Sequence, residues 1–208
     1  MKSIIISVRP EYAQKILNGE KTLELRKSVP KDFVGWVYMC VTKAKPLLAR
    51  YESVPQVTGL GTVGTSDFLY EITDKSDKLA KHFTNGLVVA RWWFDEYEKI
   101  PFEIMLPQGY ENEDGIWVDN SIYGYWVGEH ITRQSCLNDD EIENYGNFKD
   151  LYAWHIKRLE IFDKPMELGE FYKGDMKKYI DVNGVNQFNY YFKVTRAPQS
   201  WRYVWVKE

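Results

Sequence analysis

The sequence predicts a mainly β fold of the α+β class, a small β-barrel with an N-terminal helix, peripheral helices and loop insertions. Many short apolar segments, each bounded by turn residues, have the length and composition of strands. One clear amphipathic helix pattern lies near the N-terminus, and the chain shows no alternation of strands with helices. The 208 residues contain no internal repeat and no long linker, which predicts a single domain over 1–208.

The first 27 residues carry the clearest elements. The apolar run at 3–8 predicts a buried strand. Pro10 suits the first position of a helix, and Gly19 stands where that helix would end. Alternation over 21–27 predicts a second strand, with two leucines on one face and Thr, Glu and Arg on the other.

Later elements follow from the same patterns. The apolar and aromatic segments that predict strands are 34–41, 88–97, 152–162, 188–194 and 203–206. Lys164-Pro165 is expected to break the third of these, 152–162, and 167–171 to form a turn or short helix. Asn138 predicts the cap of a short helix that ends near Gly146, and Asp114-Gly115 predicts a tight turn.

The two ends of the chain are expected to close one barrel, built from 1–43 and 150–206. Scattered Pro and Gly residues mark 44–85 as an insertion, and acidic, turn-rich sequence marks 101–135 as a second one. The apolar residues expected in the core are Ile4, Ile6, Leu23, Leu25, Val37, Val89, Ile156 and Val204.

The formal net charge of −3 hides a strong asymmetry along the chain. Residues 1–50 have net charge +6, residues 51–150 have −12 and residues 151–208 have +3. If the two ends meet, they make a basic face that can bind a phosphate backbone locally. The sequence pI near 5.7 argues against strong non-specific binding of nucleic acid.

Several classes of protein are disfavoured by composition. No stretch approaches the ~18 apolar residues of a membrane span, and the N-terminus does not read as a signal peptide. Cys40 and Cys136 give no disulfide framework, so a cytoplasmic, reducing setting without a membrane partner is expected. The aromatic fraction of 16% suits both a β-rich core and a surface that stacks on bases.

Three motifs that can signal chemistry are weak here. Gly59–Gly64 matches the dinucleotide fingerprint as a string, but neither a buried strand before it nor a helix after it is evident. The three histidines are far apart in sequence, and His155 is expected to be half-buried and hydrogen-bonded. Ser200 lacks the surroundings of a nucleophile elbow. We therefore expect no metal and no cofactor.

The informative cluster lies in the second strand. Residues two apart on a strand share one face, so Glu24 and Arg26 can form a polar patch that Lys21 can reach. One interpretation is a solvated strand face with a surface ion pair. The other is a cleft in which Lys and Arg hold an anion while Glu accepts hydrogen bonds or orients a proton.

The same region resembles the opening motif of the activating-signal-cointegrator homology (ASCH) family. The segments that carry this resemblance are 6–13, 15–27, 86–90, 152–156, 162–165 and 198–201. Together they are similar to the bacterial and phage branch of the family. The resemblance implies a PUA-like barrel with a cleft beside the first helix, and a role in binding RNA or modified nucleotides. It places cleft residues at Lys21, Glu24 and Arg26.

Some small members of the family are amidohydrolases of acetylated cytidine that use a Lys and a Thr three residues later. This chain keeps the lysine as Lys21 but has Glu24 where the threonine would stand. A carboxylate does not replace a hydroxyl nucleophile that a lysine activates, which disfavours the same hydrolysis. Ribonuclease activity has also been proposed within the family, and no nuclease motif here decides it.

Three functions therefore compete. The first is a module that binds RNA, another single strand or a nucleotide-like ligand through Lys21, Glu24, Arg26, Lys27, Arg9, Trp154, Ser200 and Trp201. The second is an enzyme acting on a nucleotide, with Lys21 and Glu24 sharing proton transfer. The third is a protein-interaction module whose acidic, aromatic insertions matter more than the cleft.

Overall fold

The computed structural model describes residues 1–52, 57–58, 61–62, 68–106, 108–173, 178–180, 186–188 and 192–206. The chain divides into two compact units. Unit 1 contains Met1–Gly19, Val34–Trp93 and Arg158–Glu208, and unit 2 contains Glu20–Phe33 and Phe94–Lys157. Each unit therefore combines segments that are far apart in the sequence.

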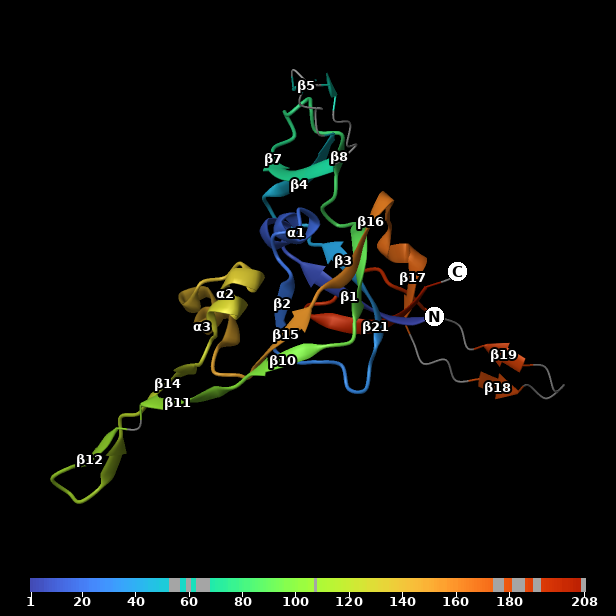
Figure 1. Cartoon of the computed structure of the whole chain (residues 1–208). Coiled ribbons are helices and arrows are strands. Elements are labelled where there is room, and N and C mark those ends of the chain that lie inside the picture. Colours follow the sequence, from blue (N-terminus) through green and yellow to red (C-terminus); the bar gives the residue numbers. More distant parts are fainter. Residues whose placement is uncertain are drawn as a thin grey trace. The chain divides into compact units, whose positions relative to one another are not determined.

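A seven-stranded mixed sheet forms the centre of unit 1 (Figure 1). Its strands, in spatial order, are β16 (Lys157–Met166), β9 (Val88–Phe94), β3 (Gly35–Val41), β1 (Lys2–Val8), β21 (Trp201–Val206), β17 (Phe171–Lys173) and β20 (Phe192–Lys193). Strand β1 pairs in parallel with β3 and antiparallel with β21. The prediction that the first and last strands of the chain pair is confirmed.

Helix α1 (Pro10–Leu17) follows β1 directly, as predicted. Pro10 occupies the first turn, where its missing N–H costs no hydrogen bond. Ala13, Ile16 and Leu17 are buried on one face. The helix ends before Gly19, whose φ of +79° is a left-handed value that glycine adopts without strain.

The first expected insertion builds a small sheet of its own within unit 1. Strands β4 (Leu47–Glu52), β7 (Phe68–Thr73) and β8 (His82–Phe83) pair in the order β7-β4-β8, apart from the seven-stranded sheet. Strands β5 (Val57–Thr58) and β6 (Gly61–Thr62) pair with each other antiparallel. Of the glycine motif at 59–64, residues 59–60 and 63–64 lie outside the described part of the chain.

A three-stranded sheet in the order β10-β15-β2 anchors unit 2, from β10 (Tyr97–Ile100), β15 (Leu151–His155) and β2 (Leu23–Arg26). Helices α2 (Glu129–Ser135) and α3 (Asp139–Gly146) accompany it. Helix α3 begins with the predicted cap, because the Asn138 side chain accepts a hydrogen bond from the Glu141 backbone N–H. The buried core of this unit comprises Leu23, Leu25, Ile100, Tyr125, Ile131, Ile142, Leu151 and Ala153.

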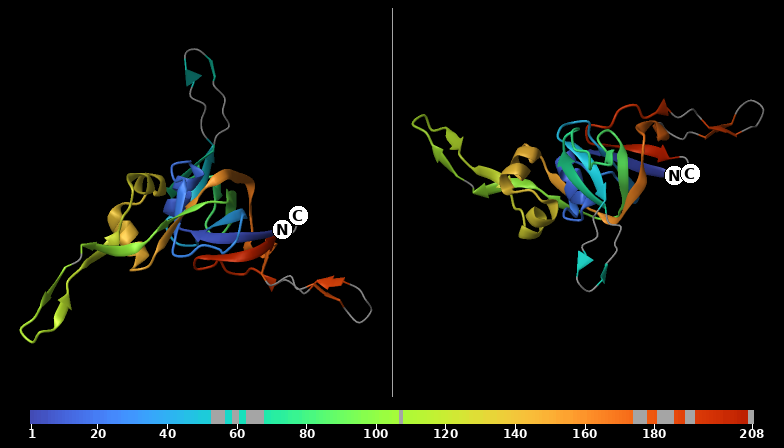
Figure 2. Two further views of the ribbon diagram at one scale, coloured as in Figure 1. Left: turned by 60° about the horizontal axis from the view of Figure 1, so that its bottom comes forward. Right: turned by 90° about the horizontal axis from the view of Figure 1, so that it is seen from above.

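Two successive hairpins extend unit 2 into an arm (Figure 2). The first pairs β11 (Phe102–Leu106) with β14 (Ile122–Tyr125), and the second pairs β12 (Gly109–Glu111) with β13 (Trp117–Asp119). Gly115, with φ of +76°, makes the predicted turn near the tip. The arm exposes aromatic side chains, and the sequence between Lys99 and Arg133 contains neither Lys nor Arg.

Some local predictions were wrong, and helix α2 was not predicted at all. The segment 152–162 is two strands, β15 and β16, separated at Ile156, and Arg158 just beyond has a left-handed φ of 47°. Pro165 does not break β16, because β16 is an edge strand, where a residue without an N–H is tolerated.

The strand predicted at 88–97 is two strands, β9 up to Phe94 and β10 from Tyr97, and residues 189–191 of the strand predicted at 188–194 lie outside the described part of the chain. A 3₁₀ turn at Leu168–Glu170 matches the turn expected at 167–171. Strands β18 (Lys178–Ile180) and β19 (Asn186–Phe188) pair with each other. Of the eight predicted core residues, Ile156 is half-buried and the others are buried. Within the described residues, no helix has both the length and the hydropathy to span a membrane.

Candidate functional site: a buried Lys–Glu–Arg cluster

Lys21, Glu24 and Arg26 meet in one cluster inside unit 2. The Glu24 carboxylate lies between the two cations, with Oε1 2.8 Å from Arg26 Nη2 and Oε2 3.4 Å from Lys21 Nζ. Lys21 Nζ also donates to the backbone oxygen of Ser135, at 2.7 Å. The side chains of Lys21, Glu24 and Arg26 are 2%, 9% and 6% exposed, so the interpretation as a solvated strand face is wrong.

The burial of this cluster follows from what surrounds β2. One edge of β2 pairs with β15, in a register that sets Glu24 opposite Trp154 and Arg26 opposite Tyr152. Helix α2 packs against β2, and Gln134 near its end accepts a hydrogen bond from the Thr22 backbone N–H. The carbonyl of Ser135, at the negative end of α2, receives the Lys21 ammonium.

The cluster combines two basic side chains with one carboxylate in a buried site. Burial lowers the pKa of Lys21, against the attraction and hydrogen bond of Glu24, which raise it. With all three groups ionised, two cations face one carboxylate and leave one net positive charge. A buried site with surplus positive charge favours an anion or an electron-rich polar group as its ligand.

Tyr145 and Lys27 extend the cluster toward solvent. Burial raises the pKa of the Tyr145 phenol, while Arg26 lowers it and Glu24 raises it, so this side chain lies in the field of the cluster. The Tyr145 residue is still 38% exposed. The exposed Lys27 ammonium lies 5.4 Å from the centre of its ring. Sequence reasoning missed both Tyr145 and the Ser135 carbonyl, since only folding brings α2 and α3 to β2.

The other predicted site residues do not join this cluster within unit 2. Trp154 is 0% exposed, and its ring packs against Phe94, with ring centres 4.8 Å apart. The prediction that Trp154 contributes to a binding surface is therefore wrong for this structure. Arg9, Ser200 and Trp201 belong to unit 1, where the Arg9 side chain is 68% exposed and lies 3.6 Å from Glu11.

The surroundings of the histidines and cysteines fit a structural role for these residues. Glu98 contacts both His130 and His155, at 3.0 and 3.1 Å, and His155 is half-buried as predicted. In the described residues, no group of three or more His, Cys, Asp or Glu is arranged to hold a metal ion. Cys40 lies in the core of unit 1, where burial raises the pKa of its thiol to about 12. Cys136 ends α2 in a left-handed conformation.

Comparisons with known proteins are distant. Neither a protein-family model nor a curated protein matches the sequence. Among solved structures, the crystal structure of ASCH from Zymomonas mobilis is 15% identical, over 99% of this chain and 88% of that one, with a TM-score of 0.46. A mutant of the same protein is 13% identical, over 100% of this chain and 92% of that one, also with a TM-score of 0.46. A likeness at this level says nothing about what this chain binds.

Proposed function

We propose that this chain is an ASCH-type module that binds single-stranded RNA and holds one nucleotide at the edge of the Lys21–Glu24–Arg26 cluster. The observation that carries the proposal is the buried cluster of two basic groups and one carboxylate, with the half-exposed Tyr145 in its electrostatic field and the exposed Lys27 beside the Tyr145 ring. The resemblance of 6–13 and 15–27 to the ASCH opening motif supports the same site.

Each group suits one part of a nucleotide. The Tyr145 ring offers a face on which an unstacked base can lie, which is how single strands are commonly bound. Lys27, beside that ring, can contact the phosphate. Glu24 is the acceptor for a base amine or a ribose 2′-hydroxyl, and Arg26 and Lys21 hold its carboxylate in place.

The depth of the cluster limits the ligand. Lys21, Glu24 and Arg26 are too buried to track a phosphate backbone, so they suit the end of one base or sugar rather than a continuous strand. The acidic arm disfavours non-specific binding, because the sequence from 100 to 132 contains no Lys or Arg. We therefore expect short, salt-sensitive contacts with a single strand and weak binding of duplexes.

Fluorescence anisotropy with a labelled single-stranded RNA oligomer, its DNA counterpart and an RNA duplex tests the proposal. Tyr145→Leu removes the stacking face and is expected to weaken RNA binding about tenfold. Lys27→Gln is expected to lower the slope of log affinity against log salt by about one counterion. The matched controls are Tyr110→Leu, another exposed tyrosine, and Lys149→Gln, another exposed lysine of unit 2. Equal loss in variants and controls, or no binding of any oligomer at low salt, contradicts the proposal.

The lowered pKa of Lys21 favours one alternative, a hydrolase of a modified nucleoside in which the Lys21 amine takes a proton. The substitution Glu24→Gln separates the two functions. In a binder it changes the preference among RNA oligomers. In a hydrolase it lowers turnover about 100-fold or more while substrate binding survives. Release of acetate from acetylated cytidine, followed with wild type, Glu24→Gln and Lys21→Met, measures this directly.

A further inference from the structure

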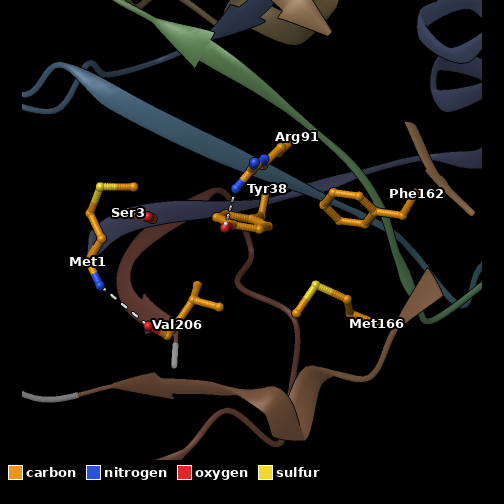
Figure 3. A pocket seen from close by; sticks show the side chains of 7 residues that line it. All are labelled: Met1, Ser3, Tyr38, Arg91, Phe162, Met166 and Val206. Carbon is orange, nitrogen blue, oxygen red and sulfur yellow. Dashed lines mark hydrogen bonds between the residues drawn. The ribbon is translucent and has the colours of Figure 1, made fainter. Parts of the chain in front are cut away.

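A second candidate site lies in unit 1, on the seven-stranded sheet. A cavity of about 330 Å³ is lined by side chains that include Ser3, Tyr38, Arg91, Phe162 and Met166 (Figure 3). The N-terminal amine lies at one side of it, where it donates to the Val206 carbonyl at 3.3 Å. The volume is at the lower end of the range of small-molecule sites.

Ser3 is the residue that points to a ligand. It is 0% exposed, and its hydroxyl has no hydrogen-bond partner among the described residues. Buried hydroxyls are nearly always hydrogen-bonded, because removing one from water without a new partner is costly. Ser7, the other serine on β1, fits that rule, since its hydroxyl donates to the Pro198 carbonyl at 2.6 Å.

Tyr38 and Arg91 add two more polar groups to the same cavity. Arg91 Nη1 donates to the Tyr38 hydroxyl oxygen at 3.2 Å, as Figure 3 shows. Because the Tyr38 oxygen accepts that bond, its own hydrogen can be donated elsewhere, and no described residue receives it. Arg91 is held by Glu160, 2.7 Å from its Nε, and by the Trp36 ring, 4.1 Å away.

We propose that this cavity binds a small monocarboxylate with an aryl or branched alkyl body. The hydroxyls of Ser3 and Tyr38 can both donate to a carboxylate, beside a fixed guanidinium. Phe162 and Met166 supply apolar surface for the body of the ligand. Glu160 neutralises part of the Arg91 charge, which favours one negative charge on the ligand over two. This site shares no residue with the Lys21 cluster, so it stands or falls independently of RNA binding.

Benzoate is the probe, and benzyl alcohol, which keeps the ring but lacks the charge, is its control. Saturation-transfer NMR on the ligand gives the affinity, and ¹³C-methyl NMR of methionine gives the location. We expect a benzoate dissociation constant of about 1 mM or below, and weaker binding of benzyl alcohol. The Met166 methyl signal shifts on titration, and the Met39 signal does not, because Met39 is fully buried and does not line the cavity.

Two serine variants separate the proposed site from a solvent-filled crevice. Ser3→Ala is expected to weaken benzoate binding about fivefold to tenfold, and Ser7→Ala to leave it unchanged. Met166→Trp, at a half-buried position, fills the cavity and is expected to abolish binding. Thermal unfolding of each variant verifies that it is folded. The proposal is overturned if benzoate does not shift Met166, if benzyl alcohol binds equally well, or if the folded Ser3→Ala and Met166→Trp variants bind like wild type.

Discussion

The two polar sites of this molecule differ in whether their buried polar groups have partners. In unit 2, the ionisable side chains of Lys21, Glu24 and Arg26 are buried, and each has an oppositely charged group or a carbonyl beside it. In unit 1, the cavity contains the neutral Ser3 hydroxyl, which no described residue satisfies. Removing any one member of the charged cluster is therefore expected to destabilise the fold, whereas a ligand in the cavity would supply the partner that Ser3 lacks.

The largest expected effect is the loss of Glu24. Glu24→Leu leaves two buried cations next to each other, so we expect the free energy of unfolding to fall by about 3–5 kcal/mol. Urea unfolding followed by tryptophan fluorescence measures it. Asp163→Asn, which removes a fully exposed carboxylate that lies 3.9 Å from the Arg50 guanidinium, is the control and should have no measurable effect. A small effect of Glu24→Leu would mean that the cluster is hydrated in solution.

Replacing the whole cluster sharpens the same comparison. The triple variant Lys21→Met, Glu24→Leu, Arg26→Met removes all three charges together, and we expect it to be within about 1 kcal/mol of wild type in stability. RNA binding should nevertheless be lost in this variant. If its stability falls as far as that of Glu24→Leu, apolar packing rather than uncompensated charge explains the single substitution.

The pH dependence of stability reports on Lys21. Its pKa is lower in the folded chain than in the unfolded chain, so unfolding takes up a proton between the folded value and 10.5. The free energy of unfolding of wild type, relative to Lys21→Met, should therefore rise with pH in that window. Below the folded pKa the lysine is charged in both states, and the difference should be flat. Urea unfolding at a series of pH values up to about 10 measures this. A difference that falls with rising pH would contradict the direction of the shift.

Loss of the Tyr38 hydroxyl in the cavity should lower the free energy of unfolding by less than loss of any charged group of the cluster. Tyr38→Phe removes the acceptor of the Arg91 hydrogen bond but keeps the ring contacts with Phe162 and Phe171. We expect a loss of about 1 kcal/mol in the free energy of unfolding, measured in urea. The same variant should also bind benzoate more weakly, so a loss of stability without a loss of binding would separate Tyr38 from the site.

The smallest expected effect is a gain, rather than a loss, in the free energy of unfolding. Without ligand, Ser3→Ala removes a buried hydroxyl that lacks a partner, so we expect it to be neutral or to stabilise the chain by up to about 1 kcal/mol. Ser7→Ala removes a made hydrogen bond and should cost about 1 kcal/mol. Differential scanning calorimetry of both variants checks the contrast. Equal destabilisation would show that Ser3 has a partner in solution.

Local patterns in the sequence predicted the elements that local rules decide. The strand at 3–8, the helix after Pro10 and the capped helix after Asn138 all formed as expected, because periodicity and caps act within a few residues. The pairing of the first and last strands also followed, since each is apolar and needs a partner.

The candidate site was predicted in its members but not in its environment. Glu24 and Arg26 were correctly grouped by the two-residue period of a strand, and Lys21, just before that strand, reaches them as expected. Their burial was not predictable, because it depends on α2. That helix, at 129–135, buries only Ile131 and Ser135 and begins without a side-chain cap. Because its sequence is mostly polar and lacks a capping signal, it resembles a loop. Tyr145 reaches the cluster from α3 only through the tertiary fold.

Strand β16 has a further consequence, for the behaviour of the protein at high concentration. An exposed sheet edge offers unpaired amides on which a second copy can add a strand, the first step of edge-to-edge aggregation. One edge of the seven-stranded sheet is β16, where Pro165 lacks an amide N–H and Asp163 and Lys164 present exposed charges. The other edge, β20, is two residues long. Both edges of this sheet are thus poor templates for self-association, although the sheet itself is wide and rich in isoleucine and valine.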